Sequence, residues 1–152
     1  MDEYEPTEGC LRGDGFEARV AAFRYTYPDA VDDDDAEWVS GAVDVRLSGA
    51  FGFHARGELD FRATELETFQ QELAALHKTL SGEAVLRHME DEIELRVTLD
   101  HGRGTISGFV QQHVRGRLEF EEIRTDQSYL FDAVAGLGRI VEAFPPRASA
   151  RQ

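Results

Sequence analysis

Apolar and polar residues alternate along several stretches of this chain, as they do in strands that bury one face and expose the other. The stretch 92–99 shows the alternation most clearly, and 51–61 repeats it with His54, Arg56 and Glu58 on the polar face. With the less regular stretches included, the pattern predicts strands over 16–27, 38–47, 51–61, 83–89, 92–99 and 105–123, the last as one long strand or a bent pair.

Two other segments have apolar residues three or four positions apart, which is the period of a helix. The first spans 64–81, where Thr64 and Glu67 fit a capping box and Gly82 fits a stop just beyond the end. Its apolar stripe is formed by Leu66, Phe69, Leu73, Leu76 and Leu80.

The second helix runs from about 126 to 144, with Asp126 or Thr125 as its N-cap. Gly136 and Gly138 lie inside it and cost ~1 kcal/mol each relative to alanine. Such glycines are tolerable where a helix packs closely on a neighbour.

These elements predict an α+β fold with a single antiparallel sheet of about six or seven strands and two helices packed on one face. The domain covers 1–144, with 1–14 as a loose lead-in, 28–37 as a solvated loop and 145–152 as a frayed tail. The predicted core contains Val45, Leu59, Phe61, Leu66, Phe69, Leu73, Leu76, Ile93, Leu95, Val97, Leu118, Phe120, Leu130, Val134, Leu137 and Val141.

One short sequence occurs twice, as HARGELDF at 54–61 and HVRGRLEF at 113–120. Aligned without gaps, 47–61 and 106–120 share seven identities in fifteen pairs. Each copy precedes a helix, so we interpret the repeat as a strand-to-helix corner whose leucine and phenylalanine enter the core. Gly57 and Gly116 could let a helix approach the sheet there.

The net charge of -14 disfavours binding to nucleic acid and to anionic membranes, both of which need clustered lysine and arginine. It would attract a basic partner, although acidity also serves solubility alone. The acidic N-terminus has no basic region followed by an apolar stretch, so we expect a cytoplasmic protein.

No motif for catalysis or for a cofactor stands out. Cys10 is the only cysteine, and it has no histidine near it in the sequence. The five histidines lack the spacing of a zinc site, so we expect no metal. His54 and His113 would meet only if the repeated strands were neighbours, which leaves a metal-binding or small-molecule domain as an alternative.

The order of elements from Leu47 onward resembles the WapI-type immunity proteins of bacteria. The resemblance rests on a strand ending in LDF, the helix TELETFQQELAALHKTL, the strand EIELRVTL, a turn followed by GTISGFV, and LEFEEIRTDQSYLFDAVAGL with its D-Q-x-x-L element at 126–130. It covers 47–144 and leaves out the acidic first 46 residues.

The resemblance implies a small, non-enzymatic cytoplasmic protein that binds and blocks a toxin, and a basic toxin would complement the acidic chain. Candidate contacts, selected for charge and exposure, are Asp32, Asp33, Asp34, Asp35, Trp38, Arg56 and Glu58. A structural subunit of a larger assembly is a further alternative, and the sequence leaves the oligomeric state open.

Overall fold

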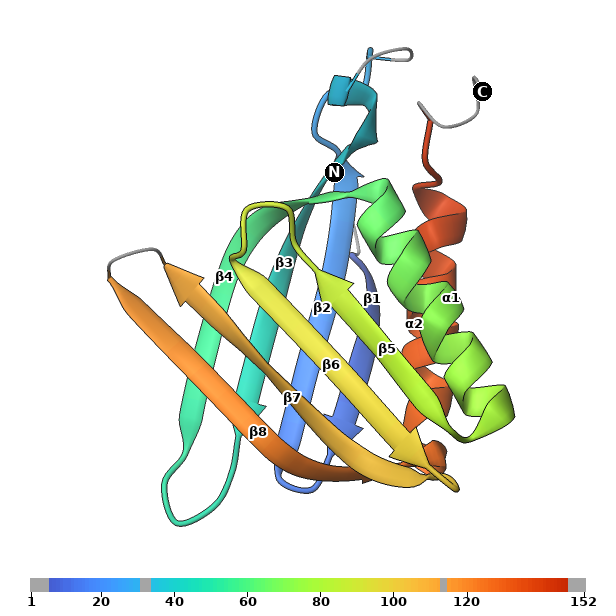
Figure 1. Ribbon diagram of the computed structural model, residues 1–152. Helices are drawn as coiled ribbons and strands as arrows, with labels where there is room; N and C mark the ends of the chain where they lie inside the picture. Colours follow the sequence, from blue (N-terminus) through green and yellow to red (C-terminus); the bar gives the residue numbers. More distant parts are fainter. Residues whose placement is uncertain (1–5, 31–33, 113–114, 148–152) are drawn as a thin grey trace.

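The computed structural model describes residues 6–30, 34–112 and 115–147, and these form two units of the same plan (Figure 1). Each unit has four strands followed by one α-helix. The first unit consists of β1 (Thr7–Gly13), β2 (Phe16–Tyr25), the 3-10 helix η1 (Asp34–Glu37), β3 (Trp38–Leu47), β4 (Phe53–Arg62) and α1 (Ala63–Thr79). The second consists of β5 (Gly82–Arg87), β6 (Ile93–Asp100), β7 (Arg103–Gln112), β8 (Gly116–Asp126) and α2 (Gln127–Ala143).

The prediction of a single sheet with six or seven strands is wrong, because the strands form two separate antiparallel sheets of four. Sheet A has the order β1-β2-β3-β4, and sheet B has the order β5-β6-β7-β8. A period of two shows that one face of a strand is buried, but a helix layer and a second sheet bury that face equally well. The sequence pattern therefore contained no signal for the break between the sheets.

Sheets A and B face each other across a shared apolar core, and their strands cross obliquely (Figure 1). Every strand contributes at least one buried side chain to this core. Phe16 of β2 and Phe120 of β8 meet between the layers, with their ring centroids 4.9 Å apart. Each large side chain that is fully buried here stabilises the fold by about 1.5–3 kcal/mol relative to exposure.

Hydrogen bonds join the two sheets where the β1–β2 turn meets the end of β8, at the bottom of Figure 1. The backbone N–H of Asp14 donates to the carbonyl of Arg124 over 2.8 Å. The hydroxyl of Thr125 donates to the carbonyl of Arg12 over 2.9 Å.

A second junction lies at the top of Figure 1, where the end of β4 meets the β5–β6 turn around the buried His88. Its Nε2 donates to the carbonyl of Asp60 over 2.7 Å, and its ring meets Phe61 edge-on at 5.9 Å between centroids. Its Nδ1 accepts the backbone N–H groups of Glu90 and Glu92 at 3.3 and 3.4 Å. Both ring nitrogens of His88 are therefore used to hold the turn against sheet A.

The helices lie together on one side of the two sheets (Figure 1). α1 packs on β5 and α2 packs on β1, and the two helices contact each other. Within the described residues, no helix lies on the opposite side, where β4 and β8 are the edge strands (Figure 1). Neither helix in the described part of the chain is long and apolar enough to cross a membrane.

α2 approaches β1 very closely, and glycines on both elements permit it. A Cβ added to Gly136 would lie 2.5 Å from the Cα of Gly9 and 2.6 Å from the carbonyl oxygen of Glu8. The expectation that a helix with internal glycine packs closely on a neighbour is confirmed at Gly136. At Gly138 an added Cβ would meet only the side chain of Gln70, at 3.6 Å.

The helix bounds agree with the prediction within two residues, but only one N-cap does. Asp126 caps α2 as predicted, because its carboxylate accepts the backbone N–H of Ser128 at 2.8 Å. The capping box predicted at Thr64 and Glu67 is wrong. The N-cap of α1 is Arg62, whose backbone N–H donates to Glu65 Oε1 over 2.8 Å.

The predicted stop at Gly82 is also displaced. α1 ends at Leu80, which adopts the left-handed conformation with φ 67°, and its N–H donates to the carbonyl of Leu76. Gly82 already opens β5.

Both ends of the described chain depart from the sequence prediction. The predicted loose lead-in contains β1. Its sequence TEGCLRG has two glycines and only a short alternation of apolar and polar residues, so the strand is hard to recognise. Arg147 of the predicted tail donates to the carbonyls of Tyr27, Pro28 and Ala36 over 3.0–3.1 Å and lies 3.7 Å from the ring centroid of Tyr25. The tail is therefore held against the β2–β3 connection as far as Arg147.

The predicted core residues are buried except for four, which are half-buried. Val134 and Val141 lie on α2. Leu59 and Leu118 are the matching leucines of the repeated sequence, and they lie on the two edge strands. The repeat is thus the place where the predicted and observed cores differ on the sheets.

Replacing Gly136 by alanine should lower the free energy of unfolding by about 1–3 kcal/mol, because its Cβ would push α2 away from β1. Urea titration measures this. Gly138→Ala is the matched control, since the added methyl has room and alanine favours the helix by up to about 1 kcal/mol. Equal effects of the two substitutions would contradict the close approach.

Asp126→Ala should destabilise the protein by about 1 kcal/mol at pH 7, whereas Asp126→Asn should retain most of the cap. The side-chain and backbone hydrogen bonds from Ser128 hold the pKa of Asp126 below its ordinary value. This stabilisation is therefore present above the ordinary pKa and lost as the pH falls through the folded value. Urea titrations at pH 7 and at about pH 3 measure it. An unchanged gap between the wild type and Asp126→Ala at the two pH values would contradict this role.

Candidate functional site

The edge strands β4 and β8 lie on the side away from the helices (Figure 1). Residues of both strands line an open cleft of about 690 Å³. This volume is within the range of ligand-binding sites in proteins. We call it the edge cleft. It is lined by Val43, Phe53, His54, Ala55, Arg56, Gly57, Glu58, Leu59, Glu92, Ile93, Val110, Gln111, Gln112, Gly116, Arg117 and Leu118.

The edge cleft exists because the inner face of β4 becomes less and less buried along the strand, from Phe61 toward Phe53. Phe61, beside the His88 junction, is 0% exposed, Leu59 is half-buried, and Phe53 at the far end is 53% exposed. Phe51, in the preceding turn, is 78% exposed. An inner face with core-like alternation is therefore half in solvent, which is unusual for a strand with nothing to bind.

Both copies of the repeated sequence line this cleft. Gly57 and Leu59 come from β4, and Gly116 and Leu118 come from β8. A Cβ added at either glycine would have no atom within 4 Å, so neither glycine admits a helix as the sequence suggested.

The interpretation of the repeat as a strand-to-helix corner is correct for the first copy only. Phe61 ends the first copy directly before Arg62 and α1. Phe120 ends the second copy in the middle of β8, which continues to Asp126 before α2 begins. The longer connector after the second copy is therefore the remainder of an edge strand.

Two of the predicted contact residues, Arg56 and Glu58, lie at the edge cleft. Neither side chain has a hydrogen bond or an ion pair to another residue that the structure describes. On the opposite wall Arg117 is engaged already, because its guanidinium lies 4.0 Å from the ring centroid of Phe109 and donates to Gln111 and Glu119.

A smaller hollow of about 380 Å³ adjoins the edge cleft and shares Leu59 and Glu92 with it. We call it the acidic pocket, and it is lined by Tyr27, Trp38, Leu59, Asp60, Glu90 and Glu92. Trp38, another predicted contact, is half-buried and has the guanidinium carbon of Arg62 5.7 Å from its ring centroid. Tyr27 is 49% exposed.

The predicted acidic loop is only partly described. Asp32 and Asp33 lie outside the described residues. Asp34 and Asp35 are exposed on η1, directly before Trp38 and β3. The described candidate residues therefore lie on η1, at Trp38 directly after it, and at the edge cleft.

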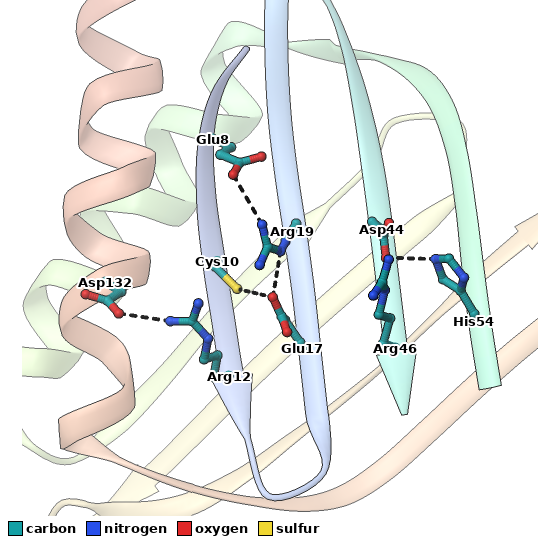
Figure 2. A network of polar contacts seen from close by, with 9 residues as sticks. All are labelled: Glu8, Cys10, Arg12, Glu17, Arg19, Asp44, Arg46, His54 and Asp132. Carbon is teal, nitrogen blue, oxygen red and sulfur yellow. Dashed lines mark hydrogen bonds and ion pairs between the residues drawn. The ribbon is translucent and has the colours of Figure 1, made fainter. Parts of the chain in front are cut away.

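The outer face of β1, β2 and β3 has a different character, because most of its charged side chains are in ion pairs, some with His54 of β4 or Asp132 of α2 (Figure 2). The pairs are Arg12–Asp132, Arg19–Glu8, Arg19–Glu17, Arg46–Asp44 and His54–Asp44, at 2.6–3.4 Å. Partial burial raises the pKa of Asp44, but Arg46 and His54 outweigh it and hold that pKa below its ordinary value. Charges neutralised in this way contribute little to attracting a partner.

Cys10 belongs to the same network, and its surroundings disfavour the thiolate. Burial, reinforced by the hydrogen bond from its thiol to Glu17, raises its pKa to about 12. At neutral pH the group is a thiol, whereas the thiolate is the reactive form.

The proposed meeting of two histidines is not tested, because His113 lies outside the described residues. His54 bonds to Asp44 at 3.0 Å (Figure 2), and His88 is used at its junction. Among the described residues, no three of the potential metal-ligating side chains form a cluster.

Sequence reasoning missed the contribution of sheet B to this site. Glu92, Val110 and Leu118 line the edge cleft, but their positions in the sequence predict ordinary strand residues or a turn. The one available signal was the repeat, since two similar edge segments mark equivalent places in the two sheets.

One of the comparisons with known proteins identifies a family. The model of the immunity protein WapI-like family matches residues 10–145. The match begins well before Leu47, so it includes most of the acidic segment that the resemblance left out. A search of the curated proteins finds no match. Since the family match spans most of the chain, the chain belongs to the WapI-like family of immunity proteins.

Proposed function

We propose that this protein is a cytoplasmic, non-enzymatic immunity protein that binds a cognate toxin and neutralises it. The observation that carries the proposal is the family match over residues 10–145. The edge cleft supports it, because it offers a partner an open concave surface lined by both apolar and charged side chains.

A binding role agrees with the chemistry of the described residues. The cleft brings an apolar floor together with a few unpaired charges, whereas the one thiol is inactive at neutral pH. We propose that the toxin contacts Arg56, Glu58 and Trp38, and that the acidic segment 32–35 extends the contact beyond Trp38.

The charge of the chain supports a basic toxin. A net charge of -14 steers a positively charged partner toward the protein and raises the association rate more than the affinity. Asp60, Glu90 and Glu92 line the acidic pocket and have no ion pair within the described residues, so the negative charge of this pocket is not neutralised by a partner there.

Capture of the toxin tests the function. The tagged protein should retain one basic toxin domain from a lysate of the source organism, and salt should elute it. The captured domain, expressed alone, should stop growth, and coexpression with this protein should restore it. Failure to capture a specific partner from cells shown to express a toxin, or capture of a domain whose toxicity persists, would contradict the proposal.

The association rate constant of the captured pair should fall about tenfold or more from low to high salt, because screening removes the steering. Stopped-flow fluorescence measures this rate. A rate independent of ionic strength would argue against a basic partner while leaving neutralisation intact.

A further inference from the structure

We propose that the toxin enters the edge cleft as an extended segment, which pairs with the free edge of β4 and adds a fifth strand to sheet A. The inference rests on the proposed function and specifies how the partner is recognised. In this mode the backbone groups of the edge strand provide affinity, and alternate side chains of the added strand provide specificity.

β4 is the edge that can accept a strand. Its pairing with β3 runs through ten consecutive residue pairs from Trp38–Arg62 to Leu47–Phe53 without a register shift. Alternate N–H and C=O groups on its other edge are therefore in line along the cleft. β8 is the poorer edge, because its pairing with β7 shifts between Ile106 and Gly108 and Glu122 has a positive φ of 58°. Irregularities of this kind protect an edge from pairing.

The floor of the cleft has room for the inward side chains of such a segment. On the inner face of β4, Ala55 and Gly57 present little volume, and the half-buried Leu59, Val110 and Leu118 line the same cleft. A Cβ added at Gly57 or Gly116 would have no atom within 4 Å. Lack of space in the folded protein therefore does not explain the glycine at either position. Two glycines in the lining of one cleft, each with open space where a Cβ would lie, leave room for a bulky apolar side chain of the added strand.

The charged residues near the cleft indicate which side chains the other face of the added segment should carry. Toward its end β4 carries Glu58 and Asp60, and the acidic pocket adds Glu90 and Glu92 in a lining that also contains Tyr27 and Trp38. None of these four carboxylates is in an ion pair within the described part of the chain. Carboxylates beside aromatic rings suit a lysine or arginine side chain. The segment therefore alternates apolar residues with polar ones and places a basic residue at the acidic pocket.

The length agrees with one strand. The uncovered part of β4 runs from Phe53 to Leu59. Seven residues at about 3.3 Å each give roughly 20 Å, which is the length of a typical strand. The exposed rings of Phe51 and Phe53 lie at its open end, where they can cover the segment.

Gly57→Val is the sharpest test, because it fills the cleft without disturbing the free protein. Gly57 has no positive φ, and valine is favourable in strands, so the melting temperature should stay the same or rise. The affinity for the captured toxin domain, measured by calorimetry, should fall about tenfold to a hundredfold. Gly116→Val should weaken it in the same way from the opposite wall. Thr105→Val, which adds the same side chain at an exposed position of β7 away from the cleft, should leave affinity unchanged.

Hydrogen exchange of the complex tests the backbone pairing itself. Alternate amides between Phe53 and Leu59 should exchange more slowly with the toxin domain bound, while amides of β1 and β2 should not change. A toxin that is bound and neutralised with neither protection of β4 nor loss of affinity in Gly57→Val would overturn the added strand and leave the proposed function standing. Pairing of β4 with a second copy of this chain, seen as a dimer by analytical ultracentrifugation that the toxin does not dissociate, would also overturn it. Absence of any toxin complex would remove both proposals together.

Discussion

The structure depends on the way in which two twisted sheets are held face to face. They are joined where the β1–β2 turn meets the end of β8 and where His88 holds the β5–β6 turn against β4. Sheets that cross obliquely stay close between two such corners and diverge at the other two. The helices fill one diverging corner, beside β1 and β5, and the edge cleft is the other (Figure 1).

Each of the two units packs its helix against the first strand of the other unit. α1 leaves the last strand of the first unit and packs on β5, and α2 leaves the last strand of the second unit and packs on β1. The close approach of Gly136 to Gly9 holds α2 against β1. Arg147 holds the end of the described chain against the β2–β3 connection. Both edge strands are consequently left on the same side, which is why the repeated residues form the two walls of one cleft.

Charge pairing differs between two parts of sheet A. On the outer face of β1, β2 and β3 most charges pair with those of neighbouring residues, so that part of the sheet is solvated without being strongly attractive. Around the cleft the carboxylates are unpaired among the described residues, and the apolar floor is exposed. A partly apolar cleft beside an acidic pocket has the features of a recognition site for a charged partner.

The sequence determined the local structure, because periodicity and capping act over a few neighbouring residues. It placed both helices within two residues, identified Asp126 as a cap and located most of the core. It also supported the family, since the resemblance depended on the order of these elements. It missed β1, whose alternation is short and interrupted by glycine.

Only the tertiary structure decided that there are two sheets, because the same alternation buries a strand against helices or against another sheet. It also decided the role of Leu59 and Leu118, which look like core residues in the sequence yet lie where the sheets have diverged. Whether an apolar face is covered depends on residues far away in the chain. The edge cleft is therefore a property of how the sheets pack, and local sequence determines only the side chains that line it.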